Sequence, residues 1–121
     1  MPTVSKSMID IAEQINGHLK RNEMLKNTLK DKGVVLNQSR SIELHFWAFA
    51  KQDAVSLAKA LYDGDLLILT LAPVPDQEGR WNIEAGVKDS VDSLTSFSMV
   101  KKFVELAARY NAVYDGWGTV V

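Results

Sequence analysis

Histidines and carboxylates are the residues of this chain with the chemistry for catalysis or metal binding. His18 and His45 belong neither to an HExxH motif nor to another spacing typical of a metal or catalytic site. We expect His18 on a solvated helix face and His45 at or just below the surface. Glu84, Asp89 and Asp92 lack the glycine-punctuated order of a calcium loop. The sequence therefore predicts no catalytic residue, no metal site and no cofactor, in a protein that is not an enzyme.

A pair of glycines near the C-terminus has the spacing of a phosphate-binding turn. Gly116-Trp117-Gly118 is a GxG core, but no third glycine, no lysine and no helix N-terminus follows it. Lys101 and Lys102 form an isolated basic pair on a predicted helix, where we expect them to be solvated. Neither feature predicts phosphate binding.

The charge balance of the 121 residues is close to neutral, with 14 Lys and Arg, 15 Asp and Glu and a formal net charge of -1. The chain as a whole therefore has no general attraction for phosphate backbones or anionic membranes. Cysteine is absent, which excludes disulfides and thiolate chemistry. The N-terminal stretch is polar, and the apolar run at 66–72 is far shorter than the roughly 20 residues of a membrane helix. We expect a cytoplasmic protein with no membrane segment.

Alternation of apolar and polar residues marks the elements of a sheet. Residues 42–50 and 80–88 alternate most clearly, so each has one apolar and one more polar face. Residues 65–72 are apolar on both parities and form a second predicted strand. The turn-rich stretch at 73–79 separates it from the third, and 112–121 is the fourth.

Apolar residues at helical spacing predict three helices. The first covers about residues 7 to 32, as one helix or as two that meet at Gly17. The second begins after Asp53, which is placed to act as its N-cap, and the third begins after Thr95 or Ser96. After the first helix, the elements therefore follow the order βαββαβ.

This order is that of a ferredoxin-like sandwich in the α+β class, with a four-stranded antiparallel sheet. Right-handed crossovers would put both later helices on one sheet face, strands 42–50 and 80–88 in the middle, and strand 112–121 beside the first. We divide the chain into an N-terminal helical segment, 1–33, and a ferredoxin-like domain, 34–121, which together form one structural unit.

The sheet face away from the helices is the best candidate for a partner-binding surface, since aromatic, arginine and hydrogen-bonding side chains meet there. The residues expected on it are His45, Trp47, Arg80, Asn82, Glu84 and Lys88. Asp115 and Trp117 are added as candidates because they share one parity of the closing strand, opposite to the glycines. Whether Trp117 faces the helices stays open at this stage.

Other occupants of that face are also compatible with the sequence. The N-terminal helix or a second copy of the chain could cover it, which would make the protein a structural homodimer in the second case. RNA or a small ligand could use Trp47, Phe49 and Trp117 as a stacking surface. Direct nucleic acid binding is disfavoured for two reasons. The polar face of the predicted strand 80–88 has no aromatic side chain, and the chain as a whole has no excess of positive charge.

The final segment, RYNAVYDGWGTVV, resembles the ending of the ribonuclease E inhibitor RraB family. The aromatic strand HFWAF, the segment QDAVSLAKALYDG and the helix LTSFSMVKKFVELAARYN follow one another in the order of that family. The resemblance covers roughly residues 20 to 121. The family's namesake continues into an acidic tail after its last strand, whereas this sequence ends at Val121.

The resemblance implies a ferredoxin-like domain that acts by binding ribonuclease E and changing its activity, without catalysis of its own. We therefore expect a cytoplasmic, non-enzymatic, protein-binding regulator of RNA decay. The alternatives are an RNA- or small-ligand-binding module that uses the open sheet face, and a homodimeric structural domain.

Overall fold

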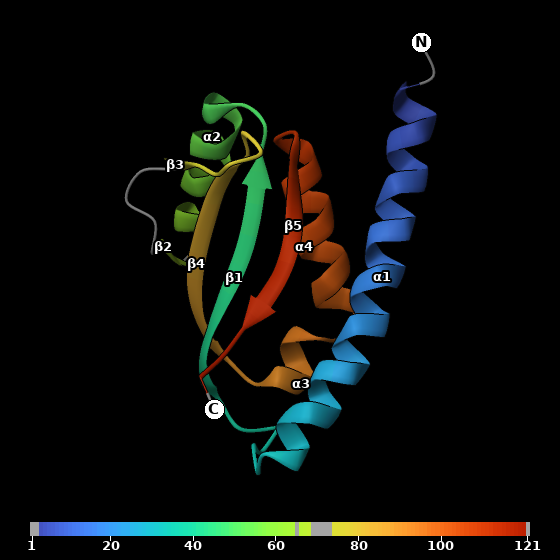
Figure 1. The fold of residues 1–121 in the computed structure, drawn as a ribbon, viewed down its shortest axis with the longest axis vertical. Helices are drawn as coiled ribbons and strands as arrows, with labels where there is room; N and C mark the ends of the chain where they lie inside the picture. The colour runs from blue at the N-terminus through green and yellow to red at the C-terminus, as the bar shows by residue number, and fades with distance from the viewer. Residues whose placement is uncertain (1–2, 65, 69–73, 121) are drawn as a thin grey trace.

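The protein is an α+β domain with an N-terminal helix and an antiparallel sheet covered on one face by helices (Figure 1). The computed structural model describes residues 3–64, 66–68 and 74–120. The elements are α1 (Thr3–Asp31), β1 (Arg40–Ala48), α2 (Lys51–Asp63), β2 (Leu67–Ile68), β3 (Val74–Pro75), β4 (Trp81–Asp89), α3 (Val91–Leu94), α4 (Phe97–Arg109) and β5 (Ala112–Gly118).

The strand order is β2-β4-β1-β5, and all the pairs are antiparallel. The long strands follow the predicted arrangement, with β1 and β4 adjacent in the middle and β5 beside β1. The prediction of four full strands is supported only in part. Three strands are long, while β2 and β3 are two-residue pairings on the outer side of β4. Pro75 contributes to this shortness because it lacks an N–H for the ladder. The rest of the strand expected at 65–72 lies outside the described residues, except for Leu66, which is not in a strand.

The core lies between the sheet and helices α2 and α4. Alternation in β1 puts its even-numbered residues from Ile42 to Ala48 on the helix side, and these side chains are almost fully buried. Phe46 packs against Tyr114 of β5 and Phe103 of α4, with ring centroids 5.2 and 6.4 Å away. Burial of an aromatic side chain such as Phe46 stabilises the fold by roughly 2 to 3 kcal/mol. Strand alternation therefore fixes which face of the sheet is left open.

The helix starts follow the predicted capping chemistry only in part. Ser96 caps α4, since its hydroxyl accepts a hydrogen bond from the Met99 N–H at 3.3 Å. The prediction for α2 was wrong: Ala50 is at the N-cap position and no side chain caps it. Asp53 lies in the first turn instead, where its negative charge interacts favourably with the positive end of the helix dipole.

Helix α1 is continuous, so the break considered at Gly17 does not occur. It contributes Ile15 and Leu29 to the core, and this packing compensates for the low helix propensity of glycine. The helix packs beside α4 and contacts the edge strand β5, where His18 Nε2 donates a hydrogen bond to the Tyr114 carbonyl at 2.9 Å (Figure 1). Helix α1 therefore does not cover the open sheet face.

Candidate functional site

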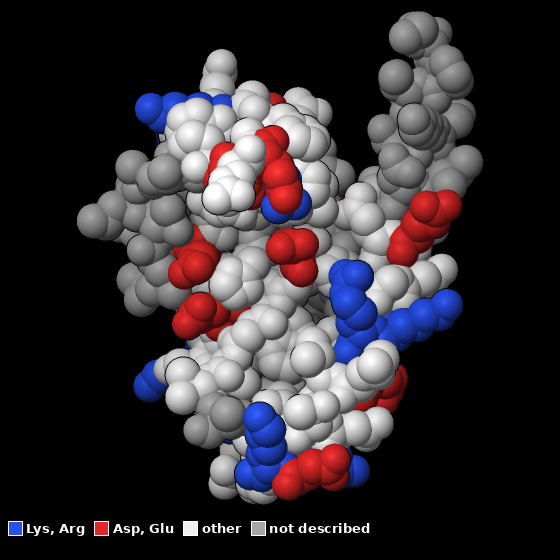
Figure 2. Space-filling view, viewed as in Figure 1, with Lys and Arg blue, Asp and Glu red and all other residues white. Residues whose placement is uncertain are grey.

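The open face of the sheet joins residues from β1 and β4 that are far apart in the sequence. In the antiparallel register His45 lies opposite Glu84, and Trp47 lies opposite Asn82. Cross-strand neighbours on one face have contacting side chains. Figure 2 shows this face, with acidic side chains over the strands. The sheet therefore brings together most of the residues predicted as a partner-binding surface.

Two aromatic rings and a guanidinium form a cluster at one end of this face. The guanidinium carbon of Arg80 lies 5.2 Å from the ring centroid of Trp47, a cation–π distance. Phe49 packs edge-on against the same indole, with centroids 5.0 Å apart, and is 69% exposed. Trp47 itself is half-buried between them. Planar, preordered side chains of this kind are typical of binding hot spots.

The turn before β4 holds Arg80 in place through Asp76. The Asp76 carboxylate accepts hydrogen bonds from the Arg80 N–H at 2.9 Å and the Arg80 Nε at 3.0 Å. It also accepts from the Glu78 N–H and from Asn82 Nδ2, and Arg80 pairs with Glu78 as well. These hydrogen bonds, led by the one from the Arg80 backbone, lower the pKa of Asp76 to about 2. The site residue Asp76 was missed in the sequence, where it was assigned only to a turn-rich connector.

His45 lies between two carboxylates farther along the same face. Its Nε2 is 3.9 Å from Glu43 Oε2, and its Nδ1 is 3.8 Å from Glu84 Oε1. These side chains are 36 to 49% exposed, so water competes with each contact. The group of three forms a mildly acidic patch beside the Trp47 cluster.

The two candidates on β5, Asp115 and Trp117, do not join this patch. A β-bulge shifts the register, so that Gly116 faces His45 while Tyr114 faces Phe46, and Asp115 is the extra residue. After the bulge Trp117 lies opposite Leu44, on the helix side of the sheet. Asp115 is exposed. The expected common face of Asp115 and Trp117 was wrong, because strand parity does not persist through a bulge.

A second group of polar side chains joins α1 to β5. Trp117 Nε1 donates to Asn22 Oδ1 at 2.8 Å, and Asn22 is only 4% exposed. His18 is 3% exposed, so its expected solvated position was wrong. Its Nε2 donates to the Tyr114 carbonyl, which leaves Nδ1 to accept from Arg21 Nη2 at 3.1 Å.

Burial is the main cause that lowers the pKa of His18 below its usual 6.5. The imidazole is therefore neutral near pH 7. Its two hydrogen bonds hold α1 against β5 and orient Arg21. His18 and Asn22 continue the apolar stripe of α1, at three and seven positions after Ile15, and that spacing was the signal for their burial.

The described side chains form no group of three metal-ligating residues that could hold an ion. Over the described part of the chain, no helix combines the length and the apolar composition that crossing a bilayer requires. What the geometry offers instead is a preordered surface that exposes aromatic, cationic and acidic groups side by side. Such a surface suits recognition of another macromolecule.

The fold and this face define a small α+β domain whose distinctive side chains lie on an open surface. The chain belongs to the RraB family, regulator of ribonuclease activity B, whose family model matches residues 19–119. The predicted family is therefore confirmed. A comparison with curated proteins gives no match. The matched residues include the whole sheet and the part of α1 that contains Asn22, so both polar groups described above lie largely within the family domain.

Proposed function

We propose that this protein is a non-enzymatic, cytoplasmic regulator that binds ribonuclease E through its open sheet face and so changes RNA decay. Family membership supports regulation of a ribonuclease. The observation that carries the choice of surface is the ordered cluster of Trp47, Phe49 and Arg80. No described element covers that cluster. The candidate surface is His45, Trp47, Arg80, Asn82 and Glu84, and it leaves out Trp117, which lies on the helix side of the sheet.

The fold that presents this surface is, in our proposal, ferredoxin-like over residues 34–121, with β2 as the remnant of a fourth strand. The order β2-β4-β1-β5 and the position of α2 and α4 on one face support this assignment. In this arrangement α1 is an N-terminal addition that braces α4 and the β5 edge. Helix α1 therefore leaves the sheet face open to a partner.

Binding to purified ribonuclease E tests the proposal. We expect saturable binding in calorimetry, and a loss of at least tenfold in affinity for Trp47→Ala, since a central aromatic residue contributes about 2 kcal/mol or more to an interface. Tyr62→Ala is the matched control, because Tyr62 is an exposed aromatic residue on α2, on the helix side. Its affinity should equal that of the unmodified protein.

Two results would overturn the proposal. One is an absence of binding to ribonuclease E, and the other is a Trp47→Ala variant that melts normally and binds with unchanged affinity. Light scattering over a range of concentrations tests the homodimer alternative. A dimer mass that disappears in Trp47→Ala would assign the face to a second copy of the chain.

A further inference from the structure

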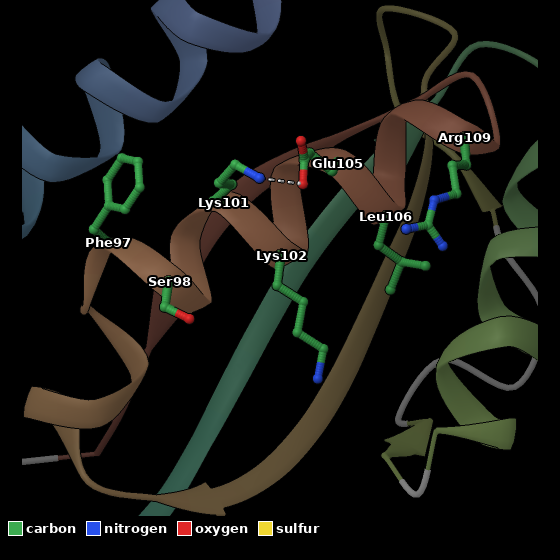
Figure 3. Close-up of a pocket in the computed structure, with 7 residues that line it drawn as sticks. All are labelled: Phe97, Ser98, Lys101, Lys102, Glu105, Leu106 and Arg109. Atoms are coloured by element: carbon green, nitrogen blue, oxygen red, sulfur yellow. Dashed lines mark hydrogen bonds and ion pairs between the residues drawn. The ribbon is translucent and has the colours of Figure 1, made fainter.

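The outward face of α4 has a basic character that the near-neutral composition conceals. The helix contains three basic residues and one acidic residue. Lys101 pairs with Glu105, with Nζ 3.1 Å from the carboxylate. Lys102 and Arg109 have no carboxylate within 4.0 Å among the residues that the structure describes. Figure 3 shows these two side chains and Leu106 projecting from the same flank of the helix.

An aromatic ring lies at one end of this face. Phe97 is 57% exposed and, in Figure 3, points away from the Lys102 flank. A shallow hollow of about 460 Å³ extends along the helix from Phe97 to Arg109, and Ser98 adds a hydroxyl to its lining. A hollow of this volume is in the range that small ligands occupy, and a nucleotide unit fits it.

The two faces of the domain differ in charge. The open sheet face has Glu43 and Glu84 on either side of His45. On the helix side, α1 lies beside α4 and has four basic and three acidic residues between positions 11 and 31. The outward face of α4, where Lys102 and Arg109 have no described carboxylate partner, therefore favours an anionic ligand more than the sheet face does, where Arg80 is paired with Asp76 and Glu78.

We propose that the outward face of α4 binds single-stranded RNA. Lys101, Lys102 and Arg109 contact phosphates along the strand, and the ring of Phe97 stacks on a base. A positive track with an exposed aromatic side chain is the usual composition of a site for single strands, and it needs no base-specific contacts. This function is separate from ribonuclease binding and uses the opposite side of the sheet.

RNA fits this face better than an acidic amphipathic protein helix does. A partner helix would need an apolar stripe of several anchors at helical spacing. Among the described residues on the outward face of α4, Phe97 is the one large apolar side chain that is well exposed. Leu106 is half-buried. A single aromatic ring beside basic side chains suits RNA, because the ring can stack on a base while the basic side chains contact the phosphates.

The test is fluorescence anisotropy of a labelled oligouridine of about 12 nucleotides, titrated with the full chain in the absence of any ribonuclease. Three phosphate contacts predict a slope of about -2 for the logarithm of affinity against the logarithm of salt. Binding should therefore weaken about 20-fold between about 50 and 200 mM salt. The double variant K102A/R109A should reduce the slope to about -0.7 and weaken binding at least tenfold.

The control variant is K59A/K88A, which removes the same charge from exposed residues on α2 and β4. It should bind like the unmodified protein. Phe97→Leu keeps an apolar side chain but removes the ring, and it should weaken binding about tenfold through lost stacking. All of these positions are exposed, so melting curves should remain unchanged.

Three outcomes would overturn the inference. They are no binding of the unmodified protein at about 50 mM salt, equal weakening by the two double variants, and tighter binding of a poly-glutamate peptide than of the oligouridine. The last result would assign the face to an acidic protein segment. None of these outcomes bears on ribonuclease E binding, which Trp47→Ala tests separately.

Discussion

Trp117 of β5 donates its indole N–H to the Oδ1 of Asn22 on α1 at 2.8 Å, across 95 positions of sequence. The contact joins the N-terminal helix to the closing strand on the helix side of the sheet. Asn22 Nδ2 has no hydrogen-bond partner among the described residues, so the bond from Trp117 satisfies the oxygen of this buried amide and not its nitrogen. Trp117 therefore stabilises the fold from the side remote from Trp47.

Trp117→Ala should lower the free energy of unfolding by about 2 to 4 kcal/mol, since it removes apolar contact with the core and leaves Asn22 Oδ1 without its donor. Trp117→Phe keeps the ring and should lower it by about 1 to 2 kcal/mol. Urea denaturation measures both changes. Asn22→Ala combined with Trp117→Phe completes a double-mutant cycle, in which we expect a coupling above about 0.5 kcal/mol. Normal stability of Trp117→Ala with loss of ribonuclease E binding would contradict this assignment.

His18 should make the stability of the protein depend on pH. Its pKa is lowered from 6.5 in the folded state, so the unfolded chain binds the proton more readily. The free energy of unfolding should therefore be constant above about pH 7 and decline as the pH falls from about 6.5 toward the lowered pKa. His18→Gln removes the titration but keeps a side-chain donor.

Denaturant titrations of both proteins from about pH 8 to about pH 5 measure this difference. His45 is present in both, so the difference in slope reports His18 alone. Parallel pH profiles would show that the protonated imidazole is tolerated between Arg21 and the Tyr114 carbonyl.

Sequence patterns predicted the features of the fold that depend on neighbouring residues, namely the position of the long strands and the order of the elements. Alternation of apolar residues placed β1 and β4 with ends shifted by only one or two residues, because one face of each strand is buried. The βαββαβ order implied which strands pair, and the observed order agrees for the long strands. The open face of His45, Trp47, Arg80 and Asn82 followed from the same alternation.

Features that depend on contacts between distant segments could not be predicted in this way. The bulge at Asp115 changes the parity of β5, so the side occupied by Trp117 depended on the pairing with β1. The spacing of His18 on α1 is a signal for its burial, but its hydrogen bond to the Tyr114 carbonyl depends on where α1 packs, which helical periodicity does not state. Asp76 was missed because its role comes from four hydrogen bonds within one turn, and turn composition reveals only that a turn exists.

Gly116 should be required for the bulge that orients Trp117. Its φ of +124° is in a region that residues with a Cβ rarely adopt, although a Cβ there would meet no atom within 4 Å. Gly116→Ala should therefore destabilise the protein by about 1 to 3 kcal/mol through backbone strain alone. It should also change the fluorescence of Trp117.

Gly118→Ala is the matched control, because a Cβ at that position would make an ordinary contact of 3.8 Å with His45 Nε2. Its unfolding free energy should remain within about 0.5 kcal/mol of the original value. Equal stabilities of the two alanine variants would mean that the bulge accommodates a side chain.

Asp76→Ala should release Arg80 from Trp47 without unfolding the sheet. The carboxylate holds both the backbone N–H and the Nε of Arg80, and Asn82 Nδ2 as well. Without it, the Arg80 Nε–H signal in NMR spectra should move toward that of a free side chain, and affinity for ribonuclease E should fall several-fold.

The pKa of about 2 predicts that Asp76 stays ionised over the physiological range, so its contacts should not vary between about pH 5 and pH 8. The stabilisation that the ionised Asp76 carboxylate gives the fold should be complete above pH 3.8, the ordinary pKa of the group, and should disappear as the pH falls through about 2. Asp76→Asn, which keeps the shape but not the charge, separates the two effects. If the Arg80 Nε–H signal is unchanged in Asp76→Ala, the stacking on Trp47 and the ion pair with Glu78 hold the guanidinium without Asp76.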